Sequence, residues 1–109
     1  MESMVKVLEM ADIPTAELAC IVKQGAILRL PYLEGRLLQA RGHVKRLSEK
    51  YQTTVETLKS QGLPEDVGYE THEDFIEWEY WDDVLRETET VVRSIKALLE
   101  QLAGTVDVH

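Results

Sequence analysis

Apolar residues recur every seven positions in the second quarter of the chain. One column holds Leu30, Leu37, Val44 and Tyr51, and a second holds Leu33, Ala40 and Leu47. Two such columns form one apolar stripe on an α-helix. We therefore expect a helix over residues 15–51, with Thr15 as its N-cap. Pro31 lies inside this helix and has no backbone N–H, so we expect a kink there.

The last third of the chain has a wider apolar face. Its three columns are Trp78, Leu85, Val92 and Leu99; Trp81, Ile95 and Leu102; and Val84, Val91 and Leu98. This pattern predicts a helix over residues 72–103, which Thr71 and Asp74 begin as a capping box and which Gly104 ends. Two columns are enough to pack against one neighbouring helix, and a third needs a further neighbour. We expect a long antiparallel helical hairpin that forms a homodimer or binds another partner.

A short helix and a loop are predicted between the two long helices. Thr53 or Thr54 caps a helix over residues 54–61, and Gly62 ends it. The proline and the glycine within residues 63–70 then predict a loop. Together with the long helices, these elements predict an all-α fold in a single domain.

The two ends of the chain give weaker patterns. Within residues 1–13, Val5 and Val7 alternate with Lys6, which suits a short strand, although the same segment also fits a helix. A single strand is not stable alone. It would have to pair with another chain or with the tail, residues 104–109, where valines also alternate.

The charge of the chain narrows the functional classes. Its 109 residues include 20 acidic and 12 basic side chains, which gives a net charge of −8. Phosphates repel such a protein, so the charge argues against nucleic acid and anionic membranes and favours a basic partner. We find no signal peptide and no apolar run long enough to span a bilayer, which predicts the cytoplasm. The single cysteine, Cys20, excludes a disulfide framework within the chain and is expected to be a small buried side chain.

The most distinctive stretch is THEDFIEWEYWDD, residues 71–83, where aromatic side chains stand among carboxylates. Acids at the start of a helix favour the positive end of its dipole, which accounts for part of this charge. The remainder predicts a surface for a basic partner, with aromatic rings that supply buried area and carboxylates that steer the encounter and fix the register. The candidate partner-binding residues are Trp78, Glu79, Tyr80, Trp81, Asp82 and Asp83.

A structural interpretation of the same residues stays open. Trp78 and Trp81 lie in the two seam columns, where core packing accounts for them. Glu79, Asp82 and Asp83 lie largely off the apolar face, where a solvated surface accounts for them. In an antiparallel hairpin the nearby bases would be Arg41, Lys45 and Arg46. Such ion pairs contribute about 0–1 kcal/mol each, so they would set the register more than the stability.

A metal site is a second hypothesis for this region. Asp74 and Glu77 lie near the end of the apolar face, where the hairpin brings His43 and Lys50. A histidine with two carboxylates can bind a divalent ion, although metal sites usually have more ligands, and pairing with Lys50 is the alternative. The segment from Glu73 to Glu77 also resembles the acidic EExxE motif of the all-helical nucleotide pyrophosphatases related to MazG. That resemblance implies a magnesium-dependent hydrolase, but no suitable ExxD motif follows on a later helix.

A longer match covers about residues 30–103 and resembles a set of short, mostly uncharacterised prokaryotic proteins. Their pattern is EKYG, a short helix, an acidic linker, and an acid-rich segment with EWE that opens a long last helix. Here EKY at residues 49–51 and EWE at residues 77–79 carry the match. The resemblance implies a small antitoxin-type or partner-binding component, often encoded beside a toxin gene, and implies no catalytic residue. Gln52 stands where glycine is frequent, which predicts a different turn after Tyr51.

These patterns favour a non-enzymatic interaction protein without a cofactor, most concretely the antitoxin of a small basic toxin. The N-terminal segment could add a strand to a sheet of the partner. Two alternatives are the metal-dependent hydrolase and a DNA-binding regulator that uses the basic face of residues 31–51. The net charge and the lack of a helix-turn-helix signature argue against the regulator.

Overall fold

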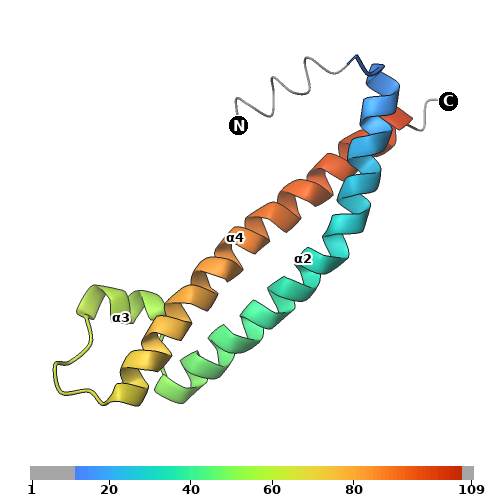
Figure 1. The fold of residues 1–109 in the computed structure, drawn as a ribbon. Helices are drawn as coiled ribbons and strands as arrows, with labels where there is room; N and C mark the ends of the chain where they lie inside the picture. The colour runs from blue at the N-terminus through green and yellow to red at the C-terminus, as the bar shows by residue number, and fades with distance from the viewer. Residues whose placement is uncertain (1–11, 107–109) are drawn as a thin grey trace.

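The computed structural model describes residues 12–106. They form three helices: α2 (Thr15–Tyr51), α3 (Val55–Gln61) and α4 (Tyr69–Val106). The long helices α2 and α4 run antiparallel as a hairpin, and α3 packs against α4 at the closed end (Figure 1). This part of the chain contains no strand, so the predicted all-α hairpin with a short connecting helix is confirmed. The strand that we predicted in residues 1–13 falls almost entirely outside the described residues.

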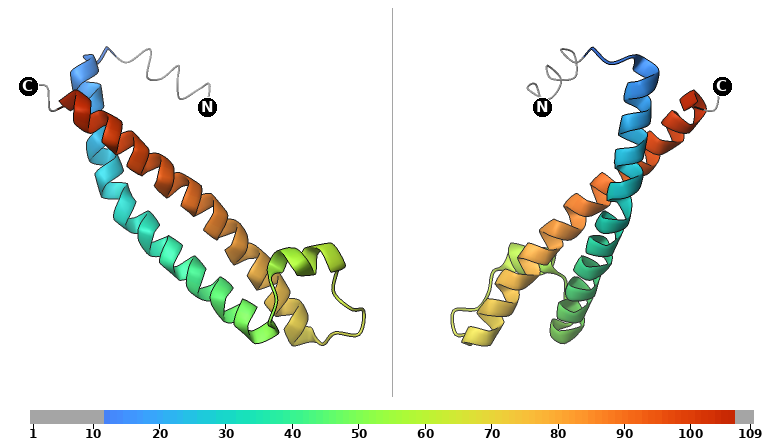
Figure 2. Two further views of the ribbon diagram at one scale, coloured as in Figure 1. Left: turned by 180° about the vertical axis from the view of Figure 1, so that it is seen from behind. Right: turned by 45° about the vertical axis from the view of Figure 1, so that its right-hand side comes forward.

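The first long helix, α2, continues through Pro31 without a break. Its axis changes direction in this part of the helix, as Figures 1 and 2 show, so a kink forms where the sequence predicted one. The proline ring removes one backbone donor and crowds the preceding turn, which bends a helix. At the start of α2, Pro14 is the N-cap and its carbonyl accepts the N–H of Leu18 at 2.9 Å. Thr15 is therefore the first helical residue, and its predicted role as the N-cap is wrong.

The second long helix, α4, extends beyond its predicted bounds at both ends. It begins at Tyr69 rather than at residue 72, because the carbonyl of Gly68 already accepts the N–H of His72 at 3.2 Å. Thr71 thus lies inside the helix and the predicted capping box is wrong. The helix also runs past Gly104 to Val106. A single glycine costs a helix only about 1 kcal/mol, which a long helix tolerates.

The predicted seam forms the core of the hairpin. The buried apolar side chains are Leu33, Leu37, Ala40 and Leu47 on α2, Val55 on α3, and Trp78, Val84 and Val92 on α4. Leu47, Val55 and Trp78 make one compact cluster at the closed end. In the third column of α4, by contrast, Val91 is 44% exposed and Leu98 is 37% exposed. The third column is therefore covered at Val84 and open further along the helix, where the sequence predicted a face that one neighbouring helix does not cover.

The connection between α2 and α4 follows the predicted turn signals. The hydroxyl of Thr54 accepts the N–H of Thr57 at 3.2 Å and caps α3. Gly62 ends α3 with φ +75°, a conformation that glycine adopts without steric cost. Gln52 ends α2 in the left-handed region, with φ 55° and ψ 38°. The chain then turns so that α3 lies against α4 rather than continuing α2.

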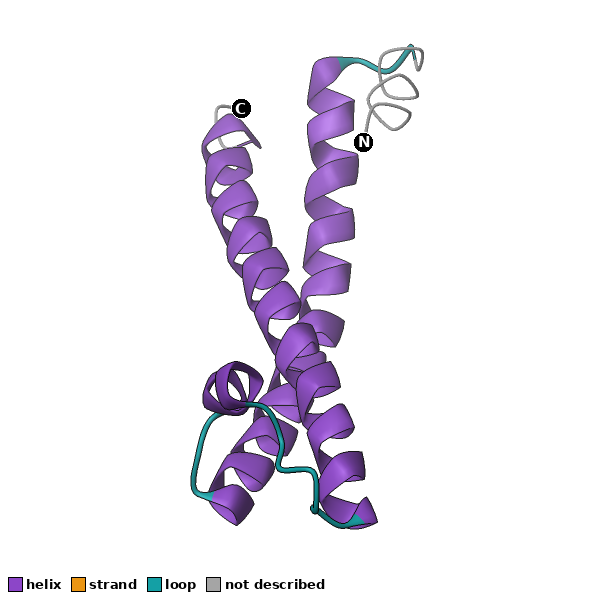
Figure 3. Ribbon diagram, turned by 90° about the vertical axis from the view of Figure 1, so that its left-hand side faces the viewer, coloured by secondary structure: helices purple, strands orange, loops and turns teal. Residues whose placement is uncertain are grey.

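The hairpin is a thin rod with extents of 64 × 27 × 19 Å. Figure 3 shows the two long helices crossing, with α3 beside them near one end. None of the described helices combines the length and the apolar composition that a membrane span needs. Cys20 is half-buried on α2, so the burial predicted for it is only partial.

Candidate functional site

Trp78 belongs to the core. Its side chain is fully buried between the two long helices and α3. Its ring stacks on Tyr51 with 5.9 Å between the ring centroids and 23° between the planes. A side chain in this position cannot contact a partner while the hairpin is folded, so the structure removes Trp78 from the predicted partner-binding set.

Trp81 and Tyr80 lie at the edge of the same seam. The ring of Trp81 is half-buried and stacks on His43 of α2, with 4.2 Å between centroids and 9° between planes. Tyr80 meets Trp81 edge-on at 5.1 Å and remains 53% exposed. The phenol of Tyr80 accepts a long hydrogen bond, 3.5 Å, from Arg36. Trp81 therefore closes the side of the hairpin, and Tyr80 presents most of its ring to solvent.

Asp82 is buried, and the prediction that it lies on a solvated surface is wrong. Only 6% of the residue is exposed, because α3 packs against this side of α4. Oδ2 lies 3.0 Å from Nε of Arg86, yet no donor among the described residues is aligned to give it a hydrogen bond. Arg86 also pairs with Glu56 of α3. Burial raises the pKa of Asp82, the nearby Asp83 and Glu89 raise it further, and the Lys59 ammonium opposes the shift.

The predicted ion-pair register across the hairpin is also corrected. The basic partner of Glu79 among the described residues is Lys59 of α3, at 4.0 Å, and not Arg41, Lys45 or Arg46. Arg46 instead binds Glu77 at 3.0 Å. The connecting helix α3 causes this difference, because it covers the face of α4 that the sequence assigned to solvent or to α2. Asp83 is exposed, as predicted.

The acids considered as metal ligands are held by bases. Asp74 Oδ2 accepts hydrogen bonds of 2.6 Å from both Lys50 and the hydroxyl of Tyr51. These two bonds hold the pKa of Asp74 below its ordinary value. Glu77 contacts Arg46 and lies 3.5 Å from Nδ1 of His43.

The alternative pairing of Asp74 with Lys50 is thus confirmed. It occupies a carboxylate that a bound cation would need. Glu73, which begins the EExxE-like segment, is exposed and forms no ion pair with a base among the described residues. Residues 12–106 contain no group of three or more His, Cys, Asp and Glu side chains arranged to hold a metal ion. A divalent ion at this end of the hairpin would have to displace Lys50 from Asp74.

One side of α4 is covered by neither α2 nor α3. We call it the open face of α4 and define it by Tyr69, Glu73, Ile76, Tyr80, Asp83, Glu87, Val91 and Leu98, all exposed. At 100° per residue these positions fall within a sector of about 80°. Ile76 is 60% exposed and has Tyr80, 53% exposed, one turn further along the helix. Apolar and acidic side chains are therefore interspersed along one exposed line.

The open face continues onto α2. A shallow hollow of about 360 Å³ separates the two helices there, with Tyr32 and Arg36 of α2 on one side and Glu87 and Val91 of α4 on the other. The sequence pattern missed most of this surface, since only Tyr80 and Asp83 belong to the predicted partner-binding set. The surplus third column, which includes Val91, was the signal that pointed to it.

A second exposed line runs along the first half of α2 and carries no charge. We call it the neutral stripe of α2 and define it by Ile21, Gly25, Leu28, Tyr32, Gly35 and Gln39, all exposed. Leu28 is 80% exposed, and the ring of Tyr32 is covered on one side by the guanidinium of Arg29 at 4.5 Å. The two exposed lines thus differ in chemistry: one is acidic and aromatic, the other neutral and aliphatic.

Comparison with known proteins assigns no function to the chain, so a functional proposal rests on the geometry described above. No family model, curated protein or solved structure matches the chain. The resemblance to short prokaryotic partner-binding proteins stays a prediction. What the structure contributes is a division of the acidic segment into side chains that hold the hairpin together and side chains that face outward.

Proposed function

We propose that this chain is a non-enzymatic interaction protein of the antitoxin type, which covers a small basic protein with the open face of α4. The observation that carries the proposal is the mixture of exposed apolar and acidic side chains on a side of α4 that neither α2 nor α3 covers. An exposed apolar line bordered by charge is typical of a helix that binds a partner.

The apolar side chains of the open face can supply buried area. Ile76 and Tyr80 are four residues apart, so their side chains lie next to each other on the helix surface. Each is more than half exposed in the free chain. Tyrosine is a frequent anchor at protein interfaces because its ring buries a large area and its hydroxyl keeps a polar contact.

The carboxylates of the open face are available to a basic partner. Glu73, Asp83 and Glu87 are exposed, and none of them pairs with a base among the described residues. The acids that face α2 and α3 are already paired: Asp74 with Lys50, Glu77 with Arg46 and Glu79 with Lys59. Unpaired outward carboxylates accelerate the encounter with a positively charged protein and reject acidic ones.

The partner-binding set changes accordingly. Tyr80 and Asp83 are retained from the set predicted by the sequence, and Glu73, Ile76 and Glu87 join them. Trp81 and Glu79 are half-buried, while Trp78 and Asp82 are buried and leave the set.

We also propose that the chain forms a homodimer through the neutral stripe of α2. Two copies that each carry a charge of −8 repel one another, so they would meet most readily where the surface has no charge. Leu28 and Tyr32 would supply the apolar contact, and Gly25 and Gly35 would allow the two helices to approach closely. This arrangement leaves most of the open face of α4 free for the other partner.

The first test is co-expression of the tagged chain with its adjacent reading frames, followed by mass spectrometry of what co-purifies at moderate salt. We expect a stoichiometric basic protein whose expression alone slows growth and whose effect the present chain relieves. Recovery of the chain alone, with no neighbour that slows growth, would contradict the antitoxin proposal.

The second test assigns the surface. The double substitution Ile76→Ser with Tyr80→Ser should weaken binding to that basic protein at least about tenfold, the loss typical of interface anchors. Leu38→Ser is the matched control, because Leu38 is 71% exposed but lies on α2, outside the open face. Circular dichroism should show unchanged helix content in both variants. Equal binding by the double variant and the wild type would exclude the open face as the site.

A further inference from the structure

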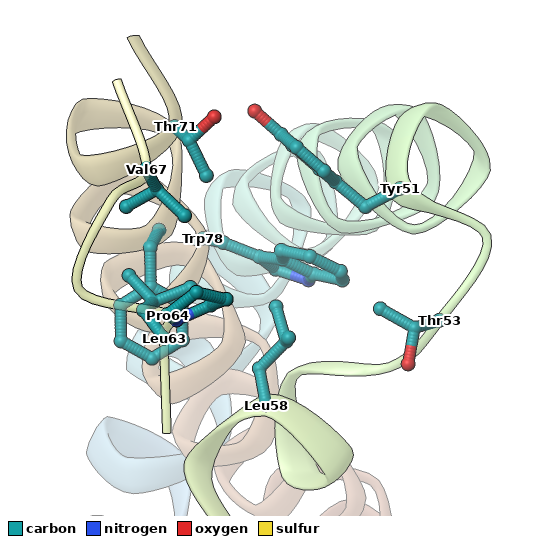
Figure 4. A pocket seen from close by; sticks show the side chains of 9 residues that line it. Tyr51, Thr53, Leu58, Leu63, Pro64, Val67, Thr71 and Trp78 are labelled. Atoms are coloured by element: carbon teal, nitrogen blue, oxygen red, sulfur yellow. The ribbon is translucent and has the colours of Figure 1, made fainter. Parts of the chain in front are cut away.

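The closed end of the hairpin contains a cavity of about 180 Å³ (Figure 4). It lies between α3, the loop of residues 62–68 and the first turns of α4. Leu58, Val67 and Phe75 are among the side chains that line it, and no charged side chain does. The cavity is on the side of α4 that α3 covers, so it is separate from the open face and independent of the proposed function.

The wall of this cavity includes a buried hydrogen-bond donor without an acceptor. Nε1 of Trp78 has no hydrogen-bond partner among the described residues, although the side chain is fully buried. Figure 4 shows the nitrogen on the edge of the ring nearer Leu58, which is one of the lining side chains. A buried N–H that makes no hydrogen bond is unfavourable. A ligand that brings an acceptor to this N–H therefore binds more tightly than a similar ligand without the acceptor.

The other polar groups of the lining do not compete for this role. The hydroxyl of Tyr51 is bound to Asp74 at 2.6 Å. In Figure 4 the hydroxyls of Tyr51 and Thr71 lie together at the rim and point away from Trp78, and the hydroxyl of Thr53 lies farther from Trp78 than the methyl group of the same side chain does. The indole N–H, which has no partner among the described residues, is therefore the polar group in the cavity wall that can orient a bound molecule.

We propose that this cavity binds a small uncharged ring compound with one hydrogen-bond acceptor, such as an aryl ketone. The ring contacts Leu58, Val67 and Phe75, and the acceptor oxygen binds the N–H of Trp78. The size fits, since an apolar cavity of about 150 Å³ holds benzene and this one is slightly larger. The lack of charged lining residues excludes ions and charged metabolites, whose desolvation nothing here would offset.

A pair of matched probes tests the proposal. Acetophenone and ethylbenzene have the same ring and the same number of side-chain carbons, and they differ by the carbonyl oxygen. Each is titrated into the ¹⁵N-labelled full chain while the indole N–H signals are recorded. The variant Trp81→Phe retains a single indole and identifies the signal of Trp78.

We expect acetophenone to shift the Trp78 signal in a saturable manner and to bind about 2- to 10-fold more tightly than ethylbenzene, the gain of one hydrogen bond. The signal of Trp81 should stay in place. If neither probe moves the Trp78 signal up to its solubility limit, or if both bind equally well, the proposal is wrong.

A second experiment fills the cavity by substitution and measures the binding of acetophenone. Val67→Phe adds a ring inside the cavity and should abolish binding of acetophenone, and Leu58→Phe serves if the first variant does not fold. Ile76→Phe is the matched control, because it adds a similar ring on the open face of α4 and should bind as the wild type does. A folded Val67→Phe protein that still binds acetophenone with unchanged affinity would place the ligand elsewhere.

Discussion

Trp78 and Asp82 lie one turn apart on α4, and each has a buried polar atom that makes no hydrogen bond within residues 12–106. Such an atom typically costs about 1–3 kcal/mol. The nitrogen of Trp78 faces a cavity, where a ligand can satisfy it. Asp82 has Arg86 nearby, but it shares that guanidinium with Glu56. At the residue scale, Asp82 is therefore a point where the fold disfavours a negative charge.

Replacing Asp82 by asparagine should stabilise the protein at neutral pH. Burial raises the pKa of Asp82 in the folded state, so at pH 7 its ionised form weakens the fold. As pH falls through the raised pKa, protonation removes this penalty. Below the pKa of the unfolded chain, about 3.9, both states are protonated and Asp82→Asn should give no further gain. Melting temperatures of wild type and variant, measured from pH 7 to pH 3, test this expectation.

Asp83→Asn is the control for this experiment. Asp83 lies on the same helix but is exposed, so its substitution should change the melting temperature less at every pH. An Asp82→Asn protein that is less stable than wild type at pH 7 would mean that the attraction to Arg86 outweighs the cost of burial.

At the scale of the elements, the turn from α2 to α3 depends on one residue in a left-handed conformation. Gln52 has φ 55° and donates its backbone N–H to the carbonyl of Ser48. Its side chain also donates to the carbonyl of Glu49 at 2.9 Å. A side chain in this region crowds the backbone, whereas glycine does not, which is why helices so frequently end with glycine.

The substitution Gln52→Gly should therefore raise the free energy of unfolding by about 0.5–1 kcal/mol, after allowance for the lost side-chain bond. Urea denaturation measures this change. Gln61→Gly is the control, because Gln61 is helical and a glycine there should give no gain. A loss of stability in Gln52→Gly would show that the bond to Glu49 matters more than the backbone conformation.

The seam between α2 and α4 predicts a large contrast between two leucines of the same helix. Leu47 is fully buried, and Leu47→Ala should lower the free energy of unfolding by about 2–5 kcal/mol. Leu38 is 71% exposed, and Leu38→Ala should change it by no more than about 0.5 kcal/mol. Urea denaturation of both variants tests the register. A similar loss in both would mean that a partner covers Leu38.

The sequence predicted the seam well because seven-residue spacing directly encodes which side of a helix is buried. Leu37, Leu47 and Val92 lie where their columns placed them. The pairing of Lys50 with Asp74 followed from the antiparallel register. The burial of Asp82 could not be predicted, because it depends on the path of α3, which no periodic pattern records. The same holds for the cavity, whose walls come from the end of α2, from α3, from the loop of residues 62–68 and from α4.

The ends of the predicted elements were less accurate for a different reason. Thr71 and Gly104 are local signals, and each would end or begin a short helix. Helix formation is cooperative, so a long packed helix extends through a single unfavourable residue. For this reason α4 passes through both positions and reaches from Tyr69 to Val106.

The whole molecule has far more surface than a compact chain of its length. Its Cα radius of gyration is 20.0 Å, whereas a compact domain of about 100 residues has about 13 Å. A two-helix rod has one main seam, so the far sides of both long helices remain exposed. The open face of α4 and the neutral stripe of α2 both result from this architecture, and each is a place where association would bury apolar area.

The proposed homodimer gives a prediction at this scale. Light scattering on a size-exclusion column should give twice the mass of the chain for the wild type. Leu28→Ser with Tyr32→Ser should shift the protein to the single-chain mass, because it removes the apolar contact of the neutral stripe. Ile76→Ser with Tyr80→Ser is the control and should remain a dimer. A wild type with the mass of one chain at high concentration would contradict the dimer.

The start of α2 and the end of α4 both lie at the end of the rod remote from α3, where the two helices diverge (Figures 1 and 3). A tension applied between these two ends therefore pulls the helices apart sideways rather than sliding one along the other. Contacts along the seam would yield one turn at a time, each under a small load, until the separation reaches the cluster of Leu47, Val55 and Trp78. The two long helices are therefore easiest to separate at the end where α2 begins and α4 ends. They resist separation most at the closed end, where α3 packs against α4.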